Sequence, residues 1–149
     1  MLSEFPDLKL PAIEPRLATE EDNTFIFDPV RKKFVLLTKE EWVRQHFVGL
    51  LINHLFYPRS LLKVESGLYY GQKQKRSDIL VYNQAAKPHL LVECKAWNQK
   101  IRRNVVEQAS VYNKTLQARY LAVSNGFSHF CWELKKDHYL PLSSLPPYR

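Results

Sequence analysis

The sequence predicts an α/β protein of the α+β kind, in which helices flank a mixed central β-sheet that follows a small N-terminal β-hairpin. Short apolar runs bounded by turn residues occupy much of the chain, and such runs are typical of strands. Two longer stretches carry apolar residues at the helical spacing instead. With 149 residues and a hydrophobic content of 45%, the chain can bury one core, so we expect one domain.

We expect residues 1–23 to form an extended arm. The stretch MLSEFPDLKLPAIEPR contains three prolines and lacks the basic start and apolar centre of a secretory signal. Residues 24–27 and 33–37 alternate around Asp28-Pro29-Val30-Arg31, which predicts a short hairpin. The single domain is therefore expected to cover residues 24–140.

The first helix should begin after Thr38. Thr38-Lys39-Glu40-Glu41 is a capping-box sequence, in which the threonine hydroxyl accepts from the backbone of the third helical residue. A helical apolar period follows, as expected at the start of a helix. One face of this helix carries Val43, Phe47, Leu50, Leu51 and His54.

Two apolar strands are predicted within KRSDILVYNQAAKPHLLVECK, the segment from Lys75 to Lys95. Asn, Gln, Lys and Pro interrupt its two apolar runs, which predicts a turn. If Asn83 faces Pro88 across this turn, Asp78 lies directly opposite Glu93, with both side chains on one face of the hairpin. Lys95 shares that face, because it stands two residues beyond Glu93.

The rest of the chain supplies the remaining elements. Residues 62–70 are a predicted strand, and a basic loop leads from it into the hairpin. A second helix presents an apolar stripe of Val105, Ala109, Tyr112 and Leu116. Residues 119–124 are expected as a buried strand, with a tight turn at Asn125-Gly126 and a hairpin partner at 129–134. Residues 141–149, with three more prolines, should be irregular.

Asp78, Glu93 and Lys95 predict a metal-dependent phosphodiesterase site. Like charges on facing strand positions destabilise a hairpin, so a cation is expected between the two acids. Mg²⁺ or Mn²⁺ binds through one or two carboxylates and takes its remaining ligands from water and phosphate, and a nearby lysine can position the attacking water. A lone Glu-x-Lys is more often a solvated face, but here it follows a run that should be buried, where charges need partners.

These residues resemble the PD-(D/E)xK nuclease superfamily, whose motif Asp78 and Glu93-Cys94-Lys95 match. Within it the chain looks like the N-terminal nuclease domain of type I restriction enzyme R subunits, in a small stand-alone form. The resemblance covers residues 38–134. The stretches that carry it are TKEEWVRQHFVGLLINHLFYPRSLLKVESGL, KQKRSDILVY, PHLLVECKAW, QASVYNKTLQARYLAVSNG and HFCWEL. It implies a restriction-endonuclease-like fold and a metal-dependent DNA endonuclease.

The resemblance also implies roles for residues outside the central motif. Gln108 and Tyr112 match a Gln-x-x-x-Tyr pattern that contacts the metal-bound water or the nucleic acid, although Tyr112 also fits a core position. The backbone carbonyl of Cys94 would be a metal ligand, and its side chain should pack inward. Glu41 would support the metal site, but the capping box explains a glutamate there without any catalytic role.

The charge of the chain favours a polyanionic partner. The net charge is +7 and the pI about 9.4, which fits DNA as the partner. Basic residues gather around the proposed site, where a solvated basic rim is the alternative to phosphate contacts. The candidate DNA-binding residues are Lys73, Lys75, Arg76, Lys100, Arg102 and Arg103, together with Tyr112.

Several functions are not expected from the sequence. The four glycines, at 49, 67, 71 and 126, cannot form the Gly-x-x-x-x-Gly-Lys-Ser/Thr phosphate loop, so we expect no nucleotide cofactor and no motor. Two cysteines give neither a disulfide framework nor zinc spacing, which favours the cytoplasm. No apolar run reaches the length of a membrane span.

Three kinds of protein remain open. The chain is expected to be a stand-alone nuclease, for which a homodimer is one option, or a subunit recruited by another protein. The alternative is a non-catalytic nucleic-acid-binding module or assembly subunit that keeps the nuclease fold. Trp97 stands where similar nucleases usually have proline, and it could stack on a base or fill the core.

Overall fold

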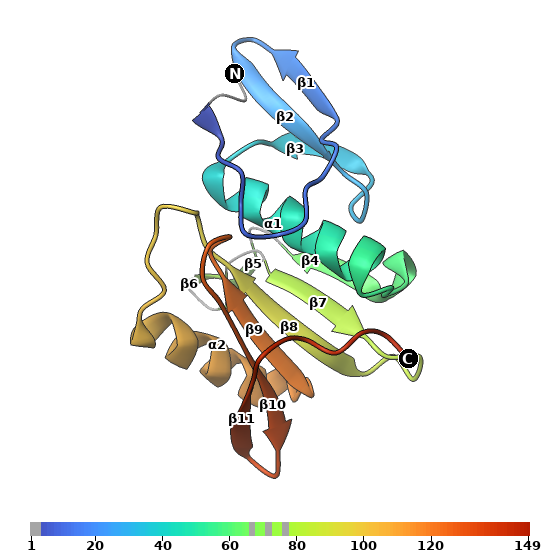
Figure 1. Cartoon of the computed structure of the whole chain (residues 1–149), viewed down its shortest axis with the longest axis vertical. Coiled ribbons are helices and arrows are strands. Elements are labelled where there is room, and N and C mark those ends of the chain that lie inside the picture. Colours follow the sequence, from blue (N-terminus) through green and yellow to red (C-terminus); the bar gives the residue numbers. More distant parts are fainter. Residues whose placement is uncertain (1–3, 66–67, 71–72, 76–77) are drawn as a thin grey trace.

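The computed structural model describes residues 4–65, 68–70, 73–75 and 78–149, and of Glu65, residues 68–70, residues 73–75 and Asp78 it describes the backbone alone. Figure 1 shows a small N-terminal sheet, a helix beneath it and a larger sheet below that helix. The elements that the structure describes are, in chain order, β1 (Leu17–Glu20), β2 (Asn23–Asp28), β3 (Lys33–Leu36), α1 (Lys39–Gly49), η2 (Leu50–His54), η3 (Arg59–Leu61), β4 (Leu62–Glu65), β5 (Leu68–Tyr70), β6 (Lys73–Lys75), β7 (Asp78–Tyr82), β8 (Pro88–Cys94), α2 (Arg103–Leu116), β9 (Tyr120–Ser124), β10 (His129–Lys135) and β11 (His138–Leu142).

The central sheet is mixed, as predicted. Its strand order is β11-β10-β9-β8-β7-β4. The pairing of β8 with β9 is parallel, and the other neighbouring pairs are antiparallel. The parallel pair requires a crossover, and α2 supplies it between the two strands. The predicted fold class, a mixed sheet flanked by helices after a small N-terminal hairpin, is therefore confirmed.

The two helices cover opposite faces of this sheet. Successive residues of a strand point to opposite faces, so alternate residues of one strand contact different helices. On β7, Ile79 and Val81 join the core cluster that contains Val43 of α1. Leu80, between them, joins the cluster that contains Val105 of α2. Continuous apolar runs in β7, β8 and β9 follow from this double coverage.

The N-terminal region contains more structure than the sequence predicted. The predicted hairpin is present as β2 and β3, but the expected arm contributes a further strand, β1, which pairs with β2. Leu17 of β1 lies opposite Ile26, which is buried against Trp42 of α1. The arm was expected to be extended throughout, and its strand was missed because Leu17–Glu20 carries little apolar signal.

Helix α1 lies between the N-terminal sheet and the central sheet (Figure 1). It begins as predicted, since Thr38 is the N-cap and its Oγ1 accepts a hydrogen bond from the backbone N–H of Glu41 at 3.0 Å. Because both sides of the helix are covered, residues 41–48 are all buried, including the polar Glu41, Arg44, Gln45 and His46. Buried polar groups need hydrogen-bond partners, and these are described with the site.

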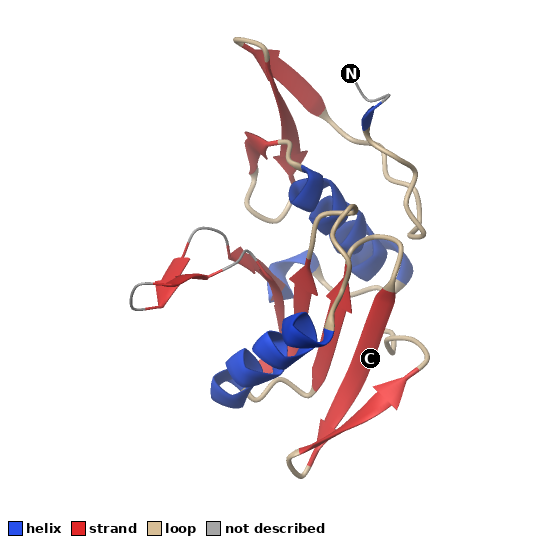
Figure 2. Ribbon diagram, turned by 90° about the vertical axis from the view of Figure 1, so that its left-hand side faces the viewer, coloured by secondary structure: helices blue, strands red, loops and turns tan. Residues whose placement is uncertain are grey.

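The predicted strand at residues 62–70 is divided in the structure. β4 ends at Glu65 and pairs with β7 in the central sheet, whereas β5 pairs with β6 in a separate two-stranded sheet. Figure 2 shows β5 and β6 projecting away from the central sheet. The stretch expected to be a basic loop therefore contains β6, at Lys73–Lys75. Arg76 lies outside the described residues.

The end of the chain also departs from the predicted irregular tail. β11 continues to Leu142, and Pro141 lies opposite Trp132 of β10. Proline is tolerated there because β11 is an edge strand. Residues 143–149 are irregular as expected, but they are held to the body: Tyr148 N donates to Leu55 O at 2.8 Å, and Tyr57 Oη donates to Pro146 O at 2.9 Å.

Candidate active site

Asp78 and Glu93 are directly opposite each other in the β7–β8 pair, as the sequence predicted. The register runs through Ile79–Val92, Leu80–Leu91 and Val81–Leu90 without interruption. The turn itself differs from the prediction, because Tyr82 rather than Asn83 faces Pro88 and the register shifts between Val81 and Tyr82. The bulge lies at the turn end, so it leaves the pairing of the two acids unchanged.

The end of β8 is enclosed between its neighbours. Glu93 is 7% exposed, Cys94 0% and Lys95 1%. Cys94 lies beside Ser124 of the parallel strand β9, and Lys95 N donates to Ser124 O at 2.9 Å. The expectation that the Cys94 side chain packs inward is confirmed. A carboxylate and an ammonium group this deeply buried require compensating charges or donors.

Two residues assigned from the Gln-x-x-x-Tyr pattern lie on α2. The helix turns Val105 and Ala109 onto the sheet, so Gln108 is exposed and Tyr112 packs partly buried against the same apolar cluster. The apolar stripe predicted for this helix is therefore confirmed. The roles of Gln108 and Tyr112 toward a metal-bound water or nucleic acid stay predictions.

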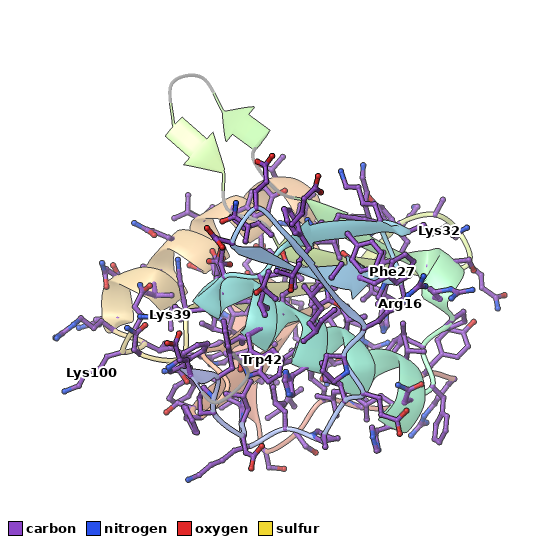
Figure 3. All side chains as sticks on the ribbon, turned by 90° about the horizontal axis from the view of Figure 1, so that it is seen from above. Arg16, Phe27, Lys32, Lys39, Trp42 and Lys100 are labelled. Carbon is purple, nitrogen blue, oxygen red and sulfur yellow. The ribbon has the colours of Figure 1, made fainter. Side chains whose placement is uncertain are left out.

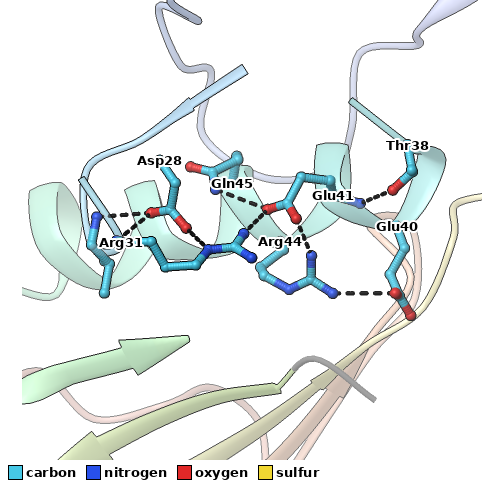
Figure 4. Close-up of polar contacts among 8 residues, drawn as sticks. Asp28, Arg31, Thr38, Glu40, Glu41, Arg44 and Gln45 are labelled. Atoms are coloured by element: carbon cyan, nitrogen blue, oxygen red, sulfur yellow. Dashed lines mark hydrogen bonds and ion pairs between the residues drawn. The ribbon is translucent and has the colours of Figure 1, made fainter. Parts of the chain in front are cut away.

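Glu41 is the centre of a buried ionic network that the sequence did not predict (Figure 4). Its carboxylate accepts from Arg31 Nη2 at 2.8 Å, from Arg44 Nη1 at 2.6 Å and from Gln45 Nε2 at 2.9 Å. Arg44 Nη2 also reaches Glu40 Oε2 at 3.2 Å. The capping box explains the backbone N–H of Glu41, but its carboxylate binds these arginines. Metal support by Glu41 stays a prediction.

Arg31 connects this network to the N-terminal sheet. It stands in the turn after β2, where its Nε donates to the buried carboxylate of Asp28. Asp28 Oδ1 also accepts from the backbone N–H groups of Val30 and Arg31. Burial opposes the charge of the guanidinium, but the carboxylates of Glu41 and Asp28 outweigh it and raise the pKa of Arg31. The sequence indicated only a turn at residues 28–31, because the partner of Arg31, Glu41, lies on helix α1.

The predicted basic surface is partly described. Lys100 and Arg102 are exposed in the segment that joins β8 to α2, and Arg103 is exposed at the first position of α2, where its Nε lies 3.2 Å from Glu107 Oε1. Lys73 and Lys75 lie on the projecting strand β6, and Arg76 is outside the described residues. Figure 3 shows Lys100 on the same side of the molecule as Lys39, an exposed lysine of α1 that was not among the predicted contacts.

Trp97 fixes the N-terminal arm beside the end of β8. Its ring lies 5.2 Å from that of Phe5, which is also 5.4 Å from that of Trp42. The indole Nε1 of Trp42 donates to Pro6 O at 2.9 Å. Lys39 Nζ is 5.9 Å from the Trp97 ring centroid. Trp97 is partly buried against the core, so filling the core is the alternative that the structure supports.

The donor set at the paired acids meets the requirements of a hard divalent metal. Among the side chains that the structure describes, no three His, Cys, Asp or Glu residues gather as a metal cluster. The side chain of Asp78 is not among them. Mg²⁺ or Mn²⁺ needs only one or two carboxylates, with water and substrate as further ligands. Two acids at facing positions, one of them buried, fit that requirement in chemistry and number.

Fold and site together define an α+β protein with a mixed central sheet, in which two facing strand positions carry acids and a lysine follows at the strand end. The chain belongs to the type I restriction enzyme R protein N terminus family, whose model matches residues 39–146 of the 149. The match begins with α1 and includes the whole central sheet. This relationship was predicted from the sequence and is confirmed.

The other comparisons add no relatives. No curated protein and no solved structure matches the chain. Neither of the helices in the described ranges is long and apolar enough to cross a membrane.

Proposed function

We propose that this protein is a Mg²⁺- or Mn²⁺-dependent endonuclease that hydrolyses DNA phosphodiester bonds, with a site of the PD-(D/E)xK type. The observation that carries the proposal is the register of β7 and β8, which sets Asp78 opposite Glu93. Lys95 follows Glu93 by two positions. The family's name, which describes part of a restriction enzyme, supports DNA as the substrate.

Each residue has a distinct task in this proposal. The carboxylates of Asp78 and Glu93 and the carbonyl oxygen of Cys94 would hold the metal. When bound, the metal would polarise the phosphate and lower the pKa of a coordinated water. Lys95 Nζ would donate hydrogen bonds to the attacking water and to the phosphate oxygens on which negative charge develops. Gln108 would hold that water from α2.

The enclosure of the strand end has two chemical effects. Burial of Glu93 and Lys95 strengthens every electrostatic interaction at the site, because the local dielectric constant is low. The hydrogen bond from Lys95 N to Ser124 O fixes the backbone beside the carbonyl of Cys94. A backbone held between two neighbouring strands keeps its ligands in position before the substrate arrives.

The basic surface would hold the DNA backbone. Phosphate contacts provide affinity and orientation without reading sequence. Tyr112 would contribute from α2. The residues proposed for these contacts are Lys73, Lys75, Arg76, Lys100, Arg102 and Arg103. A second copy of the chain would place one site on each strand where both strands are cut, and translocation of DNA would need a partner subunit that carries a motor.

The test is cleavage of supercoiled plasmid and of single-stranded DNA with Mg²⁺ or Mn²⁺. Wild type is compared with Asp78→Ala and Lys95→Ala, with Lys114→Ala as the control, because Lys114 is an exposed lysine of α2. Cutting by wild type and the control alone supports the proposal. Equal cutting by all four proteins contradicts the site, and folded proteins that bind DNA without cutting it indicate a non-catalytic binding module instead.

A further inference from the structure

A pocket lies at the end of the sheet opposite to the paired acids. Its volume is about 470 Å³, within the range of sites for small ligands. Tyr82 at the end of β7 and His89 and Tyr120 near the starts of β8 and β9 line it. Glu93 stands four residues beyond His89, so about 13 Å of strand separates the two sites at ~3.3 Å per residue.

One wall of this pocket is a C-terminal segment fixed in place by its own contacts. Tyr148 Oη accepts from Gln84 Nε2 at 2.6 Å, and the Tyr148 ring lies 5.6 Å from that of Tyr57. With the bonds to Leu55 and Pro146 described above, these contacts join the segment to the turn after β7 and to the body. The wall therefore exists before any ligand binds, which lowers the entropic cost of binding.

The lining combines aromatic rings with positive charge. Tyr82, Tyr120 and Tyr148 supply rings, while Arg119 and Arg149 supply guanidinium groups. The lining residues, all within the described part of the chain, include no Asp or Glu. Arg119 is oriented by Glu133, whose Oε2 accepts from its Nε at 3.0 Å, and its Cζ lies 5.2 Å from the Tyr120 ring centroid.

The positive charge of the pocket lining also acts on His89. Its ring lies 5.2 Å from Tyr120 and 6.0 Å from Tyr57. Burial lowers the pKa of His89, and the positive charge of Arg119 lowers it further. The neutral imidazole can offer both a donor and an acceptor nitrogen to a ligand.

These features favour an anionic ligand that has a flat ring. The lining holds two guanidinium groups and no Asp or Glu, although Glu133 outside the lining pairs with Arg119. Guanidinium groups bind phosphate through parallel hydrogen bonds, and tyrosine rings stack on nucleobases. We propose that this pocket binds one nucleotide, with its base against the tyrosines and its phosphate at Arg119 and Arg149.

The nucleotide can come from two sources, a free mononucleotide or the 5′-phosphorylated end of a strand. The phosphate loop that the sequence lacks is not needed for either, because here side chains rather than backbone N–H groups would hold the phosphate. The inference does not rest on the proposed nuclease activity, since the pocket shares no residue with Asp78, Glu93 or Lys95.

The experiment is calorimetric titration in EDTA, which removes divalent metals, with dAMP, deoxyadenosine, inorganic phosphate, and short single strands with and without a 5′-phosphate. The proteins are wild type and Arg119→Gln/Arg149→Gln. Arg59→Gln is the control, because Arg59 is an exposed arginine that lies outside the pocket lining and outside the proposed DNA contacts. Circular dichroism checks that each variant is folded.

The expected result is that wild type and Arg59→Gln bind dAMP equally, and that the double variant binds it at least about tenfold more weakly, as loss of hydrogen bonds to a charged group predicts. Tighter binding of the 5′-phosphorylated strand than of the same strand without the phosphate, lost in the double variant, identifies a strand end. Binding of dAMP without that difference identifies a free nucleotide. The proposal is overturned if wild type binds no phosphorylated probe, if the double variant binds as wild type does, or if inorganic phosphate binds as tightly as dAMP.

Discussion

Arg31 donates to the carboxylate of Glu41 at 2.8 Å, and this ion pair joins the turn after β2 to helix α1. Both side chains are largely buried. Because Arg44 and Gln45 bind the same carboxylate, Glu41 links two arginines in the space between the two sheets, while Asp28 also pairs with Arg31 and Glu40 with Arg44. The pair therefore stabilises the attachment of the N-terminal sheet, whatever role Glu41 has toward a metal.

Replacement of this carboxylate should be costly. Glu41→Gln leaves Arg31 and Arg44 as partly uncompensated buried charges, so we expect the free energy of unfolding to fall by about 3–5 kcal/mol, as for other broken buried pairs. Urea unfolding followed by circular dichroism measures it. Glu107→Gln, which removes the partner of the exposed Arg103, should change stability by less than about 1 kcal/mol. Equal effects would contradict the structural role of Glu41.

Gly126 should not tolerate a side chain. Its φ is +91°, and an added Cβ would lie 2.9 Å from Leu8 Cδ2, so Gly126→Ala combines backbone strain with displacement of the arm. We expect a loss of about 1–3 kcal/mol. Gly49→Ala is the matched comparison: its Cβ would meet Ile13 Cγ2 at the same distance, but helical backbone favours Ala over Gly by about 1 kcal/mol. A smaller loss for Gly126→Ala than for Gly49→Ala would contradict this prediction.

Stability should fall in mild acid because of two histidines. Burial lowers the pKa of His46, against the effects of its hydrogen bond to Trp42 O and of Asp7, and burial with Arg119 lowers that of His89. The unfolded chain then binds more protons than the folded chain below pH 6.5, the ordinary value. The contribution of the two neutral histidines to the free energy of unfolding is therefore complete above that pH. It is lost as the pH falls toward the lowered pKa values, by at most about 1.4 kcal/mol per pH unit for each histidine.

The measurement is the free energy of unfolding from urea titrations at several pH values between neutrality and mild acid. His46→Gln and His89→Gln should each flatten the curve, whereas His138→Gln, at an exposed position of β11, should leave its slope unchanged. A wild-type curve that is level through this range would refute the assignment to these two residues.

The basic residues between β8 and α2 should determine part of the salt dependence of DNA binding. Replacing Lys100, Arg102 and Arg103 with Gln should reduce the slope of log K against log salt by about 0.9 for each phosphate that the protein no longer neutralises. Fluorescence anisotropy in EDTA measures binding without cleavage. The control removes the same charge elsewhere on the surface, at Lys32, Lys33 and Lys135. Equal reductions in both proteins would indicate binding through net charge alone.

The pairing of the two acids in the central hairpin could be predicted to the residue because its information is local. Two apolar runs and one turn leave few registers, and a shift by one residue would place Asp78 opposite an apolar position and Glu93 on the other face. The turn was misplaced by one residue because a bulge between Val81 and Tyr82 leaves no mark in an apolar pattern. Asp78 and Glu93 lie far enough from the bulge for their pairing to be predicted correctly.

The missed features are contacts between distant segments. A hydrophobic period shows that Trp42 and Trp97 are suited to burial, but it does not identify Phe5 as their partner. The same holds for Arg31 with Glu41, and for the pocket formed by Tyr82, Tyr120 and Tyr148. β1 and β11 were missed because pairing with a neighbouring strand, rather than their own composition, makes them strands.

The docking of the arm has a consequence for the order of folding. His129 Nε2 donates to Lys9 O at 2.8 Å, and Lys9 N donates to Gly126 O at 2.8 Å. The bond between Lys9 and His129 joins residues that are 120 positions apart in the sequence. The entropic cost of closing so long a loop is repaid only after the central sheet exists. During synthesis, the arm emerges before the central sheet yet docks after that sheet has formed. Weakening it should therefore accelerate unfolding and leave the rate of folding almost unchanged.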